Sequence, residues 1–148
     1  MPIKSFRGVI TPNGVDTITL HTNTGSTGYI IKKFQVMSTQ PGTAAKSVEY
    51  VAQIFSVPQT TASATVDFSD QTLLAALHLQ DQHSSDNPLS QVVIFDNMVF
   101  NQDIYVTLAD ADGDNVPGNY YIELEQVKLD LNENTVATLK DIRNIKSQ

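Results

Sequence analysis

The stretch that most constrains the fold runs from Gly28 to Met37 and reads GYIIKKFQVM. Ile30, Phe34 and Val36 fall on one side at a period of two, and the intervening residues fall on the other. Its β-branched and aromatic content is typical of a half-buried strand, and turn-forming residues bound it at both ends. The pattern predicts a long strand at the centre of a sheet.

A hairpin signal stands near the start of the chain. The dipeptide Asn13-Gly14 separates a run at 5–11 from an alternating run at 16–22. Asn-Gly between alternating runs favours a tight reversal, because both residues tolerate positive φ. The first two strands are therefore expected to pair with each other in antiparallel fashion.

The run at 47–56 carries apolar residues on both of its faces. Val48, Tyr50 and alternate residues share one face, and Val51 and Phe55 lie on the other. A strand that is apolar on both faces is packed on two sides or faces a neighbouring subunit. We name Val51 and Phe55 as candidate interface residues on this basis.

A short internal helix is expected next. Ser69 or Asp70 provides an N-cap, and leucines follow to about Leu79. A short edge strand is predicted at 65–68, just before this helix. Both elements lie in the middle of a chain whose other segments alternate at a period of two.

Further strands are predicted at 92–95, 103–108 and 120–131, which brings the number to about eight. Short turns join most of them, and little helix lies between them. This pattern indicates an all-β fold, an antiparallel β-sandwich that is most simply jelly-roll-like, and not a βαβ fold. Residues 1–131 would form this sandwich as a single domain.

The composition changes at the C-terminal end, 132–148, which is predicted to be a helical arm. Asparagine and glutamate stand at its start and Lys and Arg toward its end, as the helix macrodipole favours. Val136, Leu139 and Ile142 form a narrow apolar stripe, so the helix must dock either on its own sandwich or on a neighbouring copy. These three residues are also candidate interface residues.

The net charge and the absence of cysteine argue against several classes of function. The 148 residues carry a net charge of −7, which argues against nucleic-acid binding through phosphates. The chain has no cysteine, so disulfides, thiolate nucleophiles and Cys-ligated zinc are excluded. No apolar run reaches the length of a signal peptide or of a membrane span. We expect a protein made in the cytoplasm that does not bind membranes.

One acidic loop is a candidate metal-binding site. Asp110, Asp112 and Asp114 resemble the start of a calcium loop, but positions six and twelve of an EF-hand loop would be Asn115 and Tyr121. The EF-hand motif therefore fails. A looser oxygen site that uses the three aspartates stays open, and an ordinary turn between two strands is the competing interpretation.

Catalytic patterns are not evident. His78 and His83 match no metal-binding spacing, the glycines at 25–28 lack the lysine of a phosphate loop, and there is no Gly-x-Ser-x-Gly elbow. We therefore expect no enzyme activity and no cofactor. Five tyrosines offer aromatic faces to sugars, although tyrosines also fill sandwich cores: Tyr29, Tyr50, Tyr105, Tyr120 and Tyr121.

Several segments resemble small structural proteins of tailed marine bacteriophages. They are MPIKSFRGVI, DTITLHTNTGSTGYIIKKFQVM, VDFSDQTLLAA, FDNMVFNQDIYVT and NYYIELEQVKLDLNENTVATLKDIRN. The resemblance covers most of the chain and implies a non-enzymatic virion component, made in the host cytoplasm and present in many copies. It implies a capsid decoration or cement protein, or a head-fibre or tail component, whose partners are the major capsid protein and copies of itself. The alternative is a glycan-binding module that uses tyrosines and the 110–115 loop with calcium.

Overall fold

The computed structural model describes residues 2–20, 26–40, 48–81, 90–111 and 115–129. These residues form eight strands, and none of them lies in a helix. The strands are Ile3–Ile10 (β1), Gly14–Ile18 (β2), Thr27–Ser38 (β3), Val48–Phe55 (β4), Leu73–Asp81 (β5), Ser90–Phe95 (β6), Ile104–Asp110 (β7) and Gly118–Lys128 (β8).

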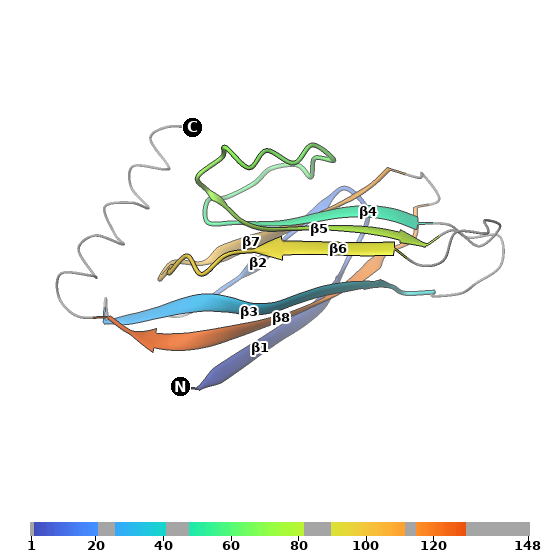
Figure 1. The fold of residues 1–148 in the computed structure, drawn as a ribbon. Coiled ribbons are helices and arrows are strands. Elements are labelled where there is room, and N and C mark those ends of the chain that lie inside the picture. The colour runs from blue at the N-terminus through green and yellow to red at the C-terminus, as the bar shows by residue number, and fades with distance from the viewer. Residues whose placement is uncertain (1, 21–25, 41–47, 82–89, 112–114, 130–148) are drawn as a thin grey trace.

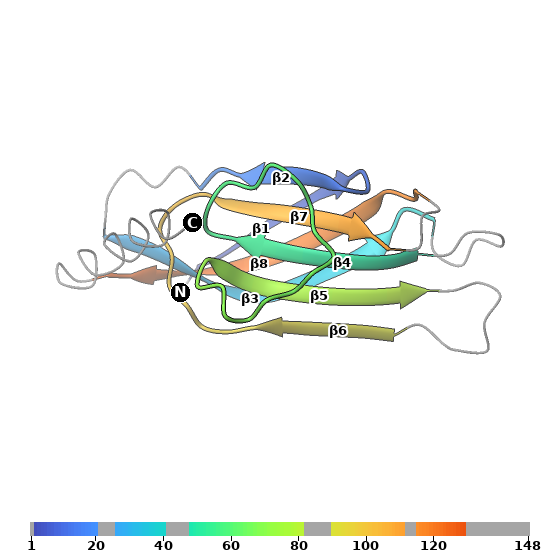
Figure 2. The same ribbon diagram turned by 90° about the horizontal axis from the view of Figure 1, so that it is seen from above.

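The strands form two antiparallel sheets that lie face to face (Figure 1). The smaller sheet has the order β1-β8-β3, and the larger has the order β2-β7-β4-β5-β6. Seen from above, β6 lies at one margin of the larger sheet and β2 at the other (Figure 2). The prediction of an all-β antiparallel sandwich of about eight strands is confirmed.

The core lies between the two sheets. Each strand contributes its inward-facing apolar residues, and burying one such aliphatic or aromatic side chain stabilises a fold by roughly 1.5–3 kcal/mol. The largest fully buried side chains are Tyr50, Phe34, Phe100, Ile31, Ile54, Leu77, Ile104, Leu108, Ile122, Leu124, Gln53 and Val106.

The long strand predicted at 28–37 is present as β3, but it is not central. It forms an edge of the smaller sheet, whose central strand is β8. The pairing with β8 shifts register between Ile31 and Lys33. This bulge reverses the alternation, so Tyr29 and Ile31 are buried together with Phe34 and Val36. The face assignment from a simple period of two was therefore wrong for the first half of β3.

The expected pairing of the first two strands was wrong. A tight turn is present, since Asn13 has a φ of 65° and the Gly14 N–H donates to the Thr11 carbonyl at 2.9 Å. However, β1 pairs with β8 and β2 pairs with β7, so the turn carries the chain from one sheet to the other. Turn residues specify a reversal of direction, whereas the neighbour of each strand depends on distant segments.

The short helix expected up to Leu79 was also wrong, because this segment is β5. Asp70 caps a turn instead of a helix, with its Oδ1 accepting a hydrogen bond from the Thr72 N–H at 2.9 Å. β5 pairs with β4 on one side and β6 on the other. These non-local pairings outweigh the helix propensity of its leucines and alanines, which is a weak local preference.

The structure shows how β4 buries both of its faces. Its inner face lies in the core, and its outer face lies under the chain segment 56–72, which crosses above the larger sheet (Figure 1). Gln53 anchors this segment, because its Nε2 donates to the carbonyls of Ser63 at 3.0 Å and Thr65 at 3.2 Å. Residues 65–68, predicted as a short edge strand, belong to this irregular segment. The predicted helical arm at 132–148 lies outside the described residues.

Candidate interaction surfaces

The first candidate surface is the open edge of the larger sheet. β6 pairs with β5 on one side, and no strand in the described part of the chain pairs with it on the other. Its six residues, SQVVIF, carry no charge. Val92 and Ile94 on its outer face are 52% and 50% exposed, whereas Val93 and Phe95 pack partly against the core. β6 therefore combines unpaired backbone groups with exposed aliphatic side chains.

The pairing pattern explains why β6 ends the larger sheet. The chain forms the pairs β1·β8, β2·β7 and β4·β5, but β6 joins β5 and does not pair with β3. The chain after β6 does reach β3, where Phe100 and Tyr29 exchange backbone hydrogen bonds of 2.7 and 3.0 Å. Their rings also lie close, with centroids 6.4 Å apart. This single bridge pairs Phe100 with the first part of β3 and does not involve the free edge of β6.

The other edge strands carry charges. β1 has Lys4 and Arg7, β2 has Asp16, and β3 has two lysines at its bulge. Charged side chains and bulges are devices by which natural sheets prevent edge-to-edge association. Among the four edge strands in the described ranges, β6 alone has no charged side chain.

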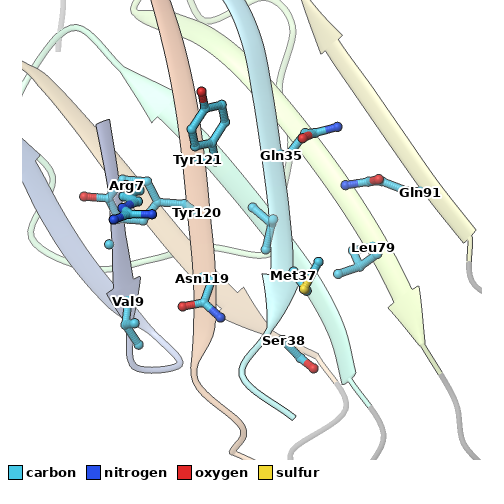
Figure 3. A pocket seen from close by; sticks show the side chains of 12 residues that line it. Arg7, Val9, Gln35, Met37, Ser38, Leu79, Gln91, Asn119, Tyr120 and Tyr121 are labelled. Atoms are coloured by element: carbon cyan, nitrogen blue, oxygen red, sulfur yellow. The ribbon is translucent and has the colours of Figure 1, made fainter. Parts of the chain in front are cut away.

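The second candidate surface is a groove on the smaller sheet, with a volume of about 790 Å³ (Figure 3). The strand register places Arg7 and Gln35 on either side of Tyr121 in one row across the three strands. Val9 and Met37 flank Asn119 in the next row. Leu79 and Gln91 extend the lining toward the larger sheet, so the groove is partly apolar and partly lined by amides.

A polar network holds the ring of Tyr121 on this face. Its hydroxyl donates to Glu123 Oε2 at 2.8 Å, and this hydrogen bond raises the pKa of Tyr121 above its ordinary value. Glu123 also forms an ion pair with Lys33 at 3.7 Å. The groove thus presents the ring of Tyr121 beside neutral amides and the guanidinium of Arg7, an arrangement that can hydrogen-bond a polar, uncharged ligand.

Two other tyrosines have structural roles. Tyr50 is fully buried, and its hydroxyl, which has one proton to donate, donates to the Val116 carbonyl and lies 3.0 Å from the Pro117 carbonyl. Tyr120 donates to the carboxylate of Asp16. Burial is the main cause that raises the pKa of both phenols. Through these contacts, Tyr50 ties the connection before β8 to β4, and Tyr120 ties the edge strand β2 to the smaller sheet.

The candidate interface residues are placed as follows. Val51 and Phe55 are 7% and 9% exposed, so within the single chain they offer little free surface. They lie on the outer face of the larger sheet, which the segment 56–72 crosses. Val136, Leu139 and Ile142 lie outside the described residues. The role of all five residues in an interface stays a prediction.

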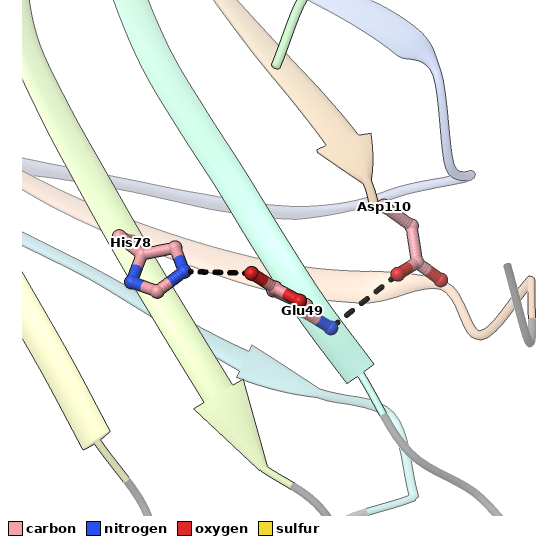
Figure 4. Close-up of polar contacts among 3 residues, drawn as sticks. All are labelled: Glu49, His78 and Asp110. Atoms are coloured by element: carbon pink, nitrogen blue, oxygen red, sulfur yellow. Dashed lines mark hydrogen bonds and ion pairs between the residues drawn. The ribbon is translucent and has the colours of Figure 1, made fainter. Parts of the chain in front are cut away.

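The three aspartates of the metal hypothesis are only partly described. Asp110 ends β7, and its Oδ1 accepts a hydrogen bond from the backbone N–H of Glu49 at 3.4 Å (Figure 4). Asp112 and Asp114 lie outside the described residues. Within the described positions, no three His, Asp or Glu side chains gather as a metal site would require. The looser oxygen site stays a prediction.

His78 lies on β5 and not on a helix. Its Nε2 is 3.3 Å from Glu49 Oε1 on the outer face of the larger sheet (Figure 4). Both side chains are more than a third exposed, so this contact contributes little to stability. His83 lies outside the described residues.

Sequence reasoning identified the strand at 92–95 but not its position at an open edge. The signal that could have found it is a short apolar run without a charge, since protected edges carry charges or bulges. The groove was missed because its rows form only when β1, β8 and β3 are side by side. Neither row is visible as a pattern along the chain.

In comparisons with known proteins, no family model, no curated protein and no solved structure matches the chain. The described residues also contain no helix with the length and apolarity to cross a membrane. The fold class, an antiparallel β-sandwich of eight strands, therefore rests on the structure itself.

Proposed function

We propose that this chain is a non-enzymatic structural component of a bacteriophage virion, and specifically a capsid decoration or cement protein. It would bind the capsid lattice, through the major capsid protein, and neighbouring copies of itself. The observation that carries an assembly role is the uncharged open edge of β6, with half-exposed Val92 and Ile94. The assignment to a virion comes from the phage-like segments of the sequence.

The charge and the strand pairing support this proposal. A net charge of −7 suits the outside of a particle better than a position against packaged DNA. Three pairings, β1·β8, β2·β7 and β4·β5, follow the order of a hairpin rolled into a jelly roll, a fold common in capsid proteins. β6 departs from this order, so we describe the sandwich as jelly-roll-like.

Quantitative mass spectrometry of purified particles tests the virion assignment. Particles from a culture that produces this chain would be banded by density and compared before and after gentle removal of surface proteins. We expect the chain to co-purify in many copies per particle and immunogold labelling to mark the capsid surface. Particles that lack the chain, or that carry it in one or two copies, would contradict the proposal.

The groove favours a second candidate function, a glycan-binding module. The ring of Tyr121 offers stacking to a neutral sugar, and the amides of Gln35, Asn119 and Gln91, which line the same groove, offer hydrogen bonds. A glycan array with the purified chain would test it, with Tyr121→Ala expected to abolish binding and Tyr105→Ala, on β7, to preserve it. Repeating the array in a chelator would test calcium. Failure to bind any glycan would exclude this function.

A further inference from the structure

We propose that the open edge of β6 pairs with β6 of a second copy of this chain. The two strands would run antiparallel about a two-fold axis and join two five-stranded sheets into one continuous sheet. The inference rests on the proposed assembly function and names the partner of its surface. It is tested on the purified chain alone, so that its failure is distinct from absence of the chain from virions.

The backbone of β6 provides the main attraction. In an antiparallel ladder, every second residue points its N–H and C=O groups away from its partner strand. β6 has β5 on one side, so the alternate residues present these groups along its free side. A second β6 offers the same groups in the reverse direction. Each outward residue can then exchange two hydrogen bonds with its counterpart.

The side chains of β6 suit pairing with themselves. A two-fold axis at Val93, near the middle of the strand, places Val93 opposite itself and Val92 of each copy opposite Ile94 of the other, whereas an axis at Val92 places Val92 opposite itself with Ile94 diagonally across. In either register, the half-exposed side chains of Val92 and Ile94 cover one another on the outer face, which removes aliphatic surface from water. The ends of the strand, Ser90 and Phe95, bring no charge into the pair.

The absence of charge makes β6 a better strand for pairing with a second copy than the charged edge strands. The whole chain carries −7, so two copies repel at long range, and that repulsion is screened at distances beyond roughly 8 Å in physiological salt. At short range, a two-fold axis through β2 would bring Asp16 of both copies together. A two-fold axis at Arg7 of β1 would likewise bring the arginines of both copies together. Like charges placed opposite each other destabilise a strand pair.

The geometry also limits the size of the assembly. Pairing across a two-fold axis uses the same strand from both copies, so neither copy has a free β6 edge in the dimer. The remaining edges of the larger sheet in the dimer are the two β2 strands, which carry Asp16. We therefore expect a closed dimer and not a fibre. Such a dimer is a natural unit at a two-fold position of a capsid lattice.

Light scattering after size exclusion and sedimentation equilibrium test the proposal at physiological salt. We expect the unmodified chain to form a dimer and the double variant Val92→Lys, Ile94→Lys to dissociate at least tenfold more readily. Both positions are half exposed, so lysine is tolerated in the monomer, while four ammonium groups would meet in the dimer. Val9→Lys, at a position 58% exposed on β1, is the matched control and should remain dimeric.

Cysteine cross-linking tests the register and uses the absence of native cysteine. Under mild oxidation, Val92→Cys or Val93→Cys should give a disulfide-linked dimer, whereas Val9→Cys should not. Thermal unfolding and circular dichroism verify that each variant is folded. A monomeric unmodified chain overturns the proposal. So does a dimer that the lysine pair leaves unchanged or that neither β6 cysteine cross-links.

Discussion

The two edges of the larger sheet differ in how they meet solvent. β2, at one edge, is tied to the rest of the sandwich by polar contacts and carries the charge of Asp16. β6, at the other edge, has no charge and exposes Val92 and Ile94. Both strands belong to one sheet and have similar lengths, so strand geometry does not account for the contrast.

Polar contacts tie β2 to the rest of the sandwich. Asp16 accepts a hydrogen bond from the Tyr120 hydroxyl on the opposite sheet. The backbone of Asn13 donates to the Leu108 carbonyl at 2.7 Å before β2 begins, and that of Leu20 donates to Asp103 Oδ1 at 3.0 Å after it ends. Within the described residues, the side chains of β6 make no comparable hydrogen bond or ion pair. Among the described residues, β2 is therefore an edge strand that is charged and held by polar contacts, whereas β6 is an uncharged edge strand with exposed aliphatic side chains.

A matched pair of isoleucines should give the largest contrast between the edges. Ile18 on β2 is 4% exposed, so Ile18→Ala is expected to cost about 3 kcal/mol of unfolding free energy through lost burial and a cavity. Ile94→Ala on β6 should change the stability of the monomer by less than about 0.5 kcal/mol. Urea unfolding at low protein concentration measures both values. Equal costs would remove the contrast.

The tie between Tyr120 and Asp16 should give the next largest effect. Tyr120→Phe removes the hydroxyl that donates to Asp16, and we expect a loss of about 1–2 kcal/mol because the tyrosine is buried and the carboxylate is half-buried. Tyr121→Phe, the neighbouring residue on the exposed face, serves as the control and should leave the melting temperature unchanged. If both variants behave alike, the buried tie does not stabilise the β2 edge.

Unfolding at alkaline pH tests the contribution of the two buried tyrosines, Tyr50 and Tyr120, to stability. Burial raises the folded-state pKa of Tyr50 and Tyr120 above the ordinary value of 10.0, so the folded state retains their protons where the unfolded state loses them. Their stabilising contribution is therefore complete below pH 10 and is lost as pH rises. Each tyrosine should add a slope approaching about 1.4 kcal/mol per pH unit.

The control for this pH effect is the pair of phenylalanine variants at the two positions. Unfolding free energies measured from pH 8 to pH 11.5 should fall less steeply for the double variant than for the unmodified chain. Parallel curves for the two proteins would show that other groups govern alkaline unfolding.

The smallest effect is expected at the exposed contact between Glu49 on β4 and His78 on β5. Glu49 and His78 are 3.3 Å apart, but their side chains are 36% and 43% exposed. Glu49→Gln should therefore change the unfolding free energy by no more than about 0.5 kcal/mol. A double-mutant cycle with His78→Gln isolates the pair. A coupling above 1 kcal/mol would show that polar contacts stabilise this side as strongly as the β2 side.

Much of the strand content could be predicted, but the partners of the strands could not. Alternation at a period of two predicted strands near the observed β1, β3, β4, β7 and β8. It failed for β5, whose leucines and alanines are compatible with a helix until β4 and β6 are placed beside them. It also failed inside β3, because an extra residue at Lys32 reverses the alternation without leaving a mark in the pattern.

The candidate surfaces were harder to predict than the fold. Val51 and Phe55 are apolar and were expected at an interface, yet the segment 56–72 crosses their face of the sheet. Sequence alone does not show which chain covers an apolar face. Val92 and Ile94, in contrast, were recognised only as strand residues, and their exposure follows from the edge position of β6.

The antiparallel β class, the acidic character, the absence of thiol chemistry and the tight turn at Asn13 all follow from the amino-acid sequence. That this turn joins two sheets, that 73–81 is a strand and that β6 ends a sheet follow from the packing of distant segments. The physical reason is the range of the interactions. Side-chain periodicity and backbone φ preferences act within a few residues, whereas strand partners are selected by packing and hydrogen bonds between distant segments.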